Sequence, residues 1–154
     1  ESLQYTRAIS SLGNLADIGS GAGFPGIPVK VLLPDLDIVL IESQRKRVSF
    51  LKTVIRSMGL EKIKCVHGVV GDFPDFLGSY DFVVLRHVLQ PSLSLSLGAG
   101  LLNARGRLIL QAGLDVSLHL DFINSLCLSL TKEIFVERSS GSPSKLMVFE
   151  RNSG

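Results

Sequence analysis

The chain has 154 residues, of which 45% are hydrophobic and 19% are charged, and its formal net charge is +2. This length and composition are typical of one globular domain with a sizeable core, and they exclude a disordered chain. No segment offers the roughly 18 uninterrupted apolar residues of a membrane span and the N-terminus lacks a signal-peptide pattern, so we expect a cytoplasmic protein that does not bind a membrane.

Short apolar runs rich in Val, Ile and Leu alternate with helical patterns along the chain, as in βαβ units around a buried parallel sheet. In chain order, the runs predict strands over residues 14–18, 37–42, 62–68, 80–86, 106–111, 133–138 and 145–151. Helices are predicted near the N-terminus, after the first strand, and over residues 43–58, 91–102 and 114–130. Gly59 is expected to end the helix over residues 43–58.

This order of elements predicts an α/β, Rossmann-like fold with a seven-stranded, mostly parallel sheet. The segment between the last two strands is too short for a crossover helix, so these strands should form an antiparallel C-terminal hairpin. That is the layout of class I S-adenosylmethionine-dependent methyltransferases, whereas a plain dinucleotide-binding fold more often continues with parallel crossovers. We expect residues 1–154 to form a single domain of this kind.

The segment ADIGSGAGFPGIP, residues 16–28, fits two ligand-binding templates. Gly21, Gly23 and Gly26 spell the G-x-G-x-x-G of dinucleotide-binding loops. The alternative template is the acidic, glycine-rich loop that holds S-adenosylmethionine, spelled by Asp17, Gly19, Gly21 and Gly23. An acid at the end of the second strand, Glu42, suits a ribose diol in either case.

Charge and missing donors favour S-adenosylmethionine. Asp17 would repel a dianionic pyrophosphate and attract a ligand that carries a sulfonium and an ammonium. Pro25 and Pro28 remove backbone N–H donors that a pyrophosphate would need. The structural alternative is a ligand-free glycine turn in which Asp17 caps the following helix.

The segments DIGSGAGFPGIP, IESQRKRVSFLKTVIRSMGL, VHG, YDFVVLR and GRLIL resemble the bacterial small-subunit ribosomal RNA guanine-N7 methyltransferases, also called glucose-inhibited division protein B. The resemblance implies methyl transfer from S-adenosylmethionine to N7 of a guanine in 16S rRNA, with the small ribosomal subunit as partner. We expect a monomer in which the family's N-terminal helical segment is absent or truncated. N7 has a free lone pair, so the chemistry needs no general base and we predict no catalytic acid or base.

Carried over by position, the resemblance makes the glycine loop and three later segments the cofactor site. Phe24 would close over the methionine arm, Glu42 would bind the ribose hydroxyls, and Arg86 would face the cofactor and orient the incoming base. Val70 and Gly71 stand where the family has an Ala-Glu pair beside the adenine, with Asp72 as a substitute acid. The predicted cofactor-binding residues are Asp17, Gly19, Ser20, Gly21, Gly23, Phe24, Glu42, Val70, Gly71 and Arg86.

Departures from the family pattern leave other functions open. The Val69 to Gly71 segment and Ala112 replace family residues, which motivates a second hypothesis, a degenerate homologue that binds cofactor or ribosome without turnover. A nicotinamide-dependent oxidoreductase is a third hypothesis, against which Asp17 and the two prolines count.

Basic residues are concentrated between residues 44 and 64, where seven Lys and Arg side chains accompany one acid. On the 43–58 helix, Arg45, Lys52 and Arg56 fall on one stripe opposite an apolar face that ends at Met58. With Lys46 they are candidate contacts for RNA phosphates, the alternative being a solvated helix face. Arg47 lies on the apolar side and is expected to reach its edge or lean toward the cofactor cleft.

The cysteines and histidines indicate neither a disulfide framework nor a metal site. Cys65 and Cys127 are far apart, and we expect both to be buried. His67, His87 and His119 have no spacing typical of a metal triad, so we expect no metal. His67 and His119 are expected to be structural, and His87 to lie near the cleft where it could stack on the target base.

Overall fold

The computed structural model describes residues 2–86, 90–137 and 141–153. Seven strands form one sheet in the order β3-β2-β1-β4-β5-β7-β6, in which β7 runs antiparallel to both of its neighbours and the other pairs are parallel. The predicted fold class, including the C-terminal hairpin, is confirmed. The strands are β1 (Asn14–Ile18), β2 (Asp37–Glu42), β3 (Ile63–His67), β4 (Tyr80–Arg86), β5 (Leu102–Gly113), β6 (Leu128–Val136) and β7 (Ser144–Arg151).

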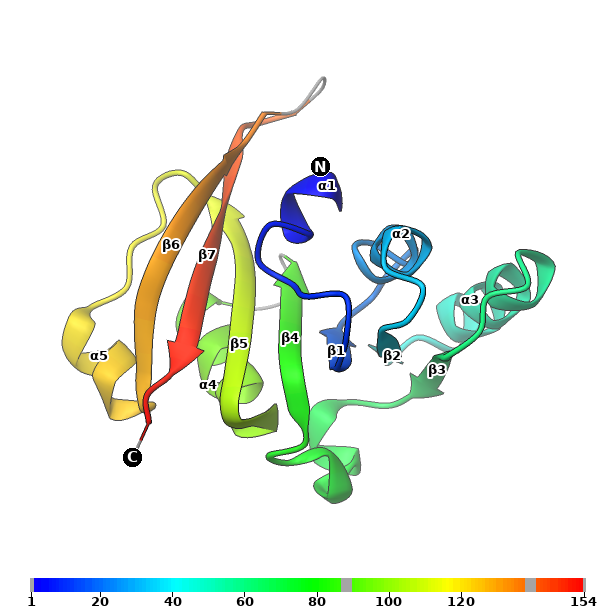
Figure 1. Cartoon of the computed structure of the whole chain (residues 1–154), viewed down its shortest axis with the longest axis horizontal. Coiled ribbons are helices and arrows are strands. Elements are labelled where there is room, and N and C mark those ends of the chain that lie inside the picture. The colour runs from blue at the N-terminus through cyan, green and yellow to red at the C-terminus, as the bar shows by residue number, and fades with distance from the viewer. Residues whose placement is uncertain (1, 87–89, 138–140, 154) are drawn as a thin grey trace.

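Helices cover both faces of the sheet (Figure 1). α1 (Ser2–Tyr5), α2 (Gly26–Leu32) and α3 (Arg45–Ser57) pack on one face. α4 (Pro91–Leu101) and α5 (Leu120–Ser125) pack on the other. Two 3-10 turns, η1 (Val70–Asp72) and η2 (Pro74–Phe76), connect β3 to β4.

The central strands are apolar on both sides because both faces of the sheet are covered. Along β4, Phe82 and Val84 face the layer of α1, α2 and α3, whereas Val83 and Leu85 face α4. Successive side chains of a strand point to opposite faces, so a strand between two helical layers needs a continuous apolar run. This explains why the central strands were predictable from composition.

The end of α3 follows the predicted glycine signal. Gly59 adopts a φ of 61°, and the N–H of Leu60 donates to the carbonyl of Ile55 at 3.0 Å. This pairing is the Schellman motif that commonly ends a helix. Met58, expected on the core face, is 52% exposed, and it is the C-cap residue at which α3 ends.

The long helix predicted over residues 114–130 is wrong. Only α5 is helical in that segment, and β6 already begins at Leu128, which lies opposite Arg151 of β7. Cys127, between the two elements, adopts a φ of 55°, outside the helical region, and is exposed rather than buried. Cys65, by contrast, is buried as expected.

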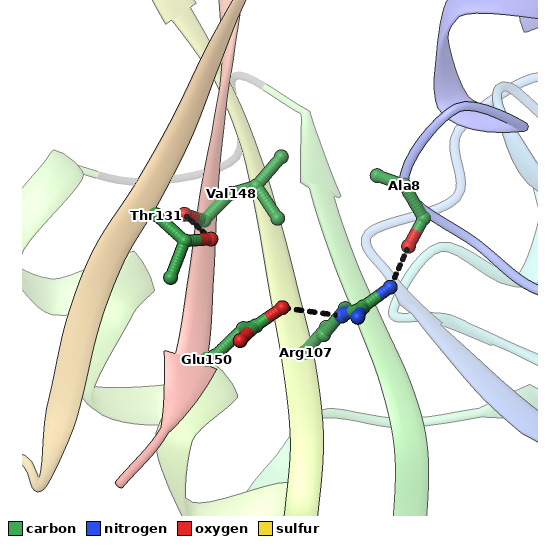
Figure 2. A network of polar contacts seen from close by, with 5 residues as sticks. All are labelled: Ala8, Arg107, Thr131, Val148 and Glu150. Atoms are coloured by element: carbon green, nitrogen blue, oxygen red, sulfur yellow. Dashed lines mark hydrogen bonds and ion pairs between the residues drawn. The ribbon is translucent and has the colours of Figure 1, made fainter.

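Arg107 of β5 ties the N-terminal segment to the sheet (Figure 2). Its Nε donates to Oε1 of Glu150 on β7 at 2.7 Å, and its Nη1 donates to the carbonyl of Ala8 at 3.4 Å. The ion pair is 44% and 42% exposed, so water screens it. We expect Arg107→Gln to lower the free energy of unfolding by less than about 1 kcal/mol in urea titrations.

A double-mutant cycle with Glu150→Gln measures the coupling of this pair. A coupling free energy well above about 1 kcal/mol would contradict the conclusion that water screens this ion pair.

No helix within the described residues is long and apolar enough to cross a membrane. Across the same residues, no three His, Cys, Asp or Glu side chains gather closely enough to hold a metal ion.

Candidate active site

A polar cleft of about 510 Å³ opens at the carboxyl ends of β1, β2 and β4. Strand order reverses between β1 and β4, and open α/β sheets bind ligands at such a switch point. The cleft is lined by Gly19, Ser20, Gly21, Ala22, Phe24, Glu42, Ser43, Gln44, Arg47 and Arg86. Six of the ten predicted cofactor-binding residues are therefore brought together here.

The glycine loop presents backbone rather than side chains to the cleft. The N–H of Gly19 donates to the carbonyl of Ile41 at 2.8 Å, which holds the loop against the end of β2. Gly21 has a φ of 57°, and a Cβ added to it would meet only Gly19 O, at 3.9 Å. That space beside the loop is open to a ligand, and only glycine adopts this conformation without strain.

Glu42 fastens the loop to the start of α3. Its Oε2 accepts the N–H of Gly21 at 2.8 Å, and its Oε1 accepts the N–H of Gln44 at 2.8 Å. The side chain is almost fully buried, yet it lines the cleft. An ionised carboxylate with two short N–H donors is firmly oriented, because hydrogen bonds to charged acceptors are the stronger kind.

Asp17 lies beneath the loop and does not line the cleft. Its Oδ2 accepts the N–H of Gly26, the first residue of α2, at 2.9 Å. This hydrogen bond is the one expected if Asp17 caps the start of the helix that follows the loop. The other oxygen, Oδ1, is buried without a hydrogen-bond partner among the described residues. Burial raises the pKa of Asp17 to about 8, against the lowering effects of the Gly26 N–H and the Arg86 charge.

The raised pKa makes folding stability depend on pH. Between about pH 4 and pH 8 the folded protein binds more protons at Asp17 than the unfolded chain, so the free energy of unfolding should fall as pH rises through this window. Asp17→Asn should remove this decline, as measured by urea unfolding at a series of pH values. An equally steep decline in the variant would contradict the assignment.

Arg86 and Arg47 place two positive charges in the cleft. Arg86 ends β4, where it lies opposite Gln111 of β5. Arg47 belongs to the first turns of α3 and lines the cleft, which is one of the two placements expected for it. Phe24 also lines the cleft and is 48% exposed, as a side chain that packs on a bound ligand would be.

A buried hydrogen-bond chain supports the strand end beside Arg86. The hydroxyl of Tyr5 donates to Oε1 of Gln111 at 2.8 Å, and Nε2 of Gln111 donates to Oγ of Ser144 at 2.9 Å. Because Gln111 neighbours Arg86 in the sheet, this chain fixes α1 and β7 next to the cleft.

Four of the predicted cofactor-binding residues do not line the cleft. Asp17 and Gly23 are buried below the loop. Val70 and Gly71 lie in η1, where the substitute acid Asp72 accepts the N–H of Val69 through Oδ2 at 2.8 Å. His67, at the end of β3, lies near η1, and its Nε2 is 3.0 Å from the carbonyl oxygen of Ser43.

Sequence reasoning missed three lining residues, Ala22, Ser43 and Gln44. Ser43 and Gln44 follow the predicted acid Glu42 directly, and the N–H of Gln44 is a partner of that acid. The signal that could have found them is the short link between an acid at a strand end and a helix start. His87, predicted near the cleft, lies outside the described residues.

The four predicted RNA contacts are all exposed on α3. Lys52 and Arg56 line a second hollow of about 680 Å³ beside β3, whereas Arg45 and Lys46 lie at the cleft end of the helix. The stripe therefore runs from the cleft to the outer edge of the sheet.

A sequence profile of the family described as rRNA small subunit methyltransferase G (GidB) matches residues 1–136. The protein named ribosomal RNA small subunit methyltransferase G in Desulfitobacterium hafniense (strain Y51) is 41% identical over 102 residues, 64% of this chain and 43% of that protein. The protein of the same name in Streptococcus pyogenes serotype M5 (strain Manfredo) is 38% identical over 124 residues, 78% of this chain and 52% of that protein. The chain spans about half the length of the curated relatives it matches.

Solved structures similar to the chain include M. jannaschii TYW2 in complex with AdoMet, with a TM-score of 0.72 and 14% identity over 96% of this chain and 72% of that chain. The B. subtilis tRNA methyltransferase TrmK has a TM-score of 0.74 and 18% identity over 99% of this chain and 65% of that chain. At these identities the likeness shows the fold alone. The family profile and the relatives together show that the chain belongs to the rRNA small subunit methyltransferase G family.

Proposed function

We propose that this chain is the catalytic domain of an S-adenosylmethionine-dependent methyltransferase that modifies N7 of a guanine in 16S rRNA. The observation that carries the proposal is the cleft at the ends of β1, β2 and β4, in which the glycine loop, Glu42 and Arg86 meet. The names of the relatives support methylation of small-subunit rRNA, and the complex of one structural neighbour with AdoMet supports the cofactor.

The residues present fit the cofactor. Glu42 offers carboxylate oxygens to ribose hydroxyls at the end of β2, and the loop leaves open space where a side chain at Gly21 would project. Burial raises the pKa of Asp17 to about 8, and a cationic ligand above the loop would favour its ionised form, whereas a pyrophosphate would disfavour it. Val70 and Gly71 would approach the adenine through their backbone.

When bound, S-adenosylmethionine supplies the methyl group: the N7 lone pair attacks the methyl carbon, the carbon–sulfur bond breaks, and the bonding pair stays on sulfur. N7 loses no proton, so the chain need only hold the base in line and exclude water. Arg86 would orient the guanine, because it lines the cleft and a guanidinium donates hydrogen bonds that base acceptors can use.

The proposed partner is 16S rRNA within the small ribosomal subunit, bound by a cytoplasmic monomer. Arg45, Lys46, Lys52 and Arg56 would contact its phosphates, because exposed cations on one stripe match a regularly spaced anion.

Transfer of a tritiated methyl group tests the proposal. The protein is incubated with labelled S-adenosylmethionine and small subunits from cells that lack the modification. Incorporation into 16S rRNA, lost in Arg86→Ala, is expected. Cofactor binding measured by calorimetry without any incorporation would instead indicate the non-catalytic homologue. Binding of NAD in place of S-adenosylhomocysteine would indicate an oxidoreductase.

A further inference from the structure

The hollow beside β3 combines positive charge with an open strand edge. It is lined by Lys52 and Arg56 of α3 and by Ile63, Lys64 and Cys65 of β3. Lys52 lies close enough to Cys65 for its charge to oppose the rise in the pKa of that thiol. α3 and β3 lie side by side at one end of the sheet (Figure 1).

β3 carries cations on both of its faces. Cys65 belongs to the core layer under α3, so the neighbouring Lys64 points to the opposite face of the sheet. There Lys64 and Lys62 line a separate hollow of about 470 Å³. The strand edge is therefore flanked by two basic side chains on each side, and the acids Glu61 and Asp37 lie with them.

Backbone donors complete this edge. Within the described residues β3 pairs only with β2. The carbonyl of Lys62 accepts the N–H of Ile38 at 2.9 Å, and the N–H of Gly68 donates to the backbone carbonyl of Glu42 at 3.0 Å. The backbone N–H and carbonyl groups of the even-numbered residues of this strand therefore point toward β2. The N–H groups of Ile63 and Cys65 consequently point outward.

We propose that this basic edge, formed by Lys52, Arg56, Lys62 and Lys64 with the outward N–H groups of β3, binds the phosphodiester backbone of the RNA substrate. The inference rests on the proposed function, which already gives Lys52 and Arg56 contacts with RNA phosphates, and it adds Lys62, Lys64 and the outward N–H groups of β3 to that contact region. Arg56 is nine residues beyond Arg47 on α3, which places the edge about 14 Å from the cleft. A strand whose target base enters the cleft can thus follow α3 to the edge.

Edge protection and strand addition are competing roles for the basic edge. Edge lysines prevent sheets from pairing with each other, but that role requires only the residues on β3 and does not explain why Lys52 and Arg56 face the same hollow. An acidic peptide could add a strand to β3, and it would use the same N–H groups. Neither role predicts that RNA affinity depends on Lys62 and Lys64.

The test compares Lys62→Gln/Lys64→Gln, which keeps the cations of α3, with Lys132→Gln/Arg105→Gln, which removes two exposed charges elsewhere. Binding of a labelled single-stranded RNA oligonucleotide is followed by fluorescence anisotropy at several salt concentrations. The first pair should weaken binding about tenfold and reduce the slope of log K against log salt by about 1.4, or about 0.7 per lost phosphate contact. The control pair should change affinity less than about twofold, and a methylphosphonate oligonucleotide should bind both variants alike.

Equal RNA affinity of the two double variants would overturn the proposal. Tighter binding of a poly-glutamate peptide than of RNA would overturn it in favour of strand addition, and self-association of Lys62→Gln/Lys64→Gln at unchanged RNA affinity would favour edge protection. Because binding is measured without methyl transfer, a wild-type protein that binds RNA at this edge yet transfers no methyl group contradicts only the proposed function.

Discussion

Gly26→Ala is expected to destabilise the protein by about 2 to 3 kcal/mol, because it overpacks the contact between α2 and the sheet. A Cβ at Gly26 would overlap Cδ2 of Leu40, which is fully buried in β2, and would lie 2.7 Å from Oδ2 of Asp17. The same methyl group would disturb the hydrogen bond from the Gly26 N–H to Asp17. Urea unfolding followed by circular dichroism measures the loss.

Gly100→Ala is the matched control. Gly100 lies in α4, and a Cβ there would make an ordinary contact with Leu77 at 3.7 Å. Alanine is the better helix former, so this variant should be neutral or more stable by up to about 1 kcal/mol. If Gly26→Ala unfolded at the same urea concentration as the wild type, the close packing of α2 on β2 would be contradicted.

Glu42→Ala is expected to weaken binding of S-adenosylhomocysteine by about 100-fold, since it removes two charge-assisted hydrogen bonds and the proposed ribose acceptor. Without the carboxylate, the N–H groups of Gly21 and Gln44 lose the partner that joins the loop to α3. Glu42→Gln keeps one acceptor oxygen and should fall between the variant and the wild type. Isothermal titration calorimetry gives the affinities.

Asp35→Ala, in the exposed turn between α2 and β2, controls for the loss of a carboxylate and should leave the affinity unchanged. An affinity of Glu42→Ala within about twofold of the wild type would contradict the role given to Glu42.

The strands β1 and β4 were predictable because helices cover both of their faces. β1 and β4 are buried on both sides, which requires the apolar runs NLADI and YDFVVLR, and the glycine loop follows from the turn that joins β1 to α2. Gly59 likewise marked the end of α3 through local backbone geometry alone.

The segment over residues 114–130 was not predictable in the same way. Its apolar residues are compatible with a helical period, but Leu128 pairs with β7, a partner distant in sequence. Tertiary pairing of this kind overrides local propensity. The exposed position of Cys127 follows from the same change of element.

Some residues of the cleft were likewise predictable from the sequence, and others were not. The loop glycines and Glu42 were identified from their places after β1 and at the end of β2, and Arg86 was identified from the family resemblance. Asp17 was expected to face the ligand, but it is one step deeper on β1 and contributes no surface to the cleft. The position of Val70 and Gly71 depends on the turn that Asp72 closes, and no periodic pattern in the sequence specifies that turn.

The atom that receives the methyl group tests the central claim most directly. Small subunits that lack the modification are incubated with the protein and S-adenosylmethionine carrying a deuterated methyl group, and the 16S rRNA is digested to nucleosides for mass spectrometry. Deuterated 7-methylguanosine is the predicted product, and it should be absent with Glu42→Ala at the same cofactor concentration. Label on any other nucleoside, or none from a protein that binds S-adenosylhomocysteine, would contradict the proposed activity.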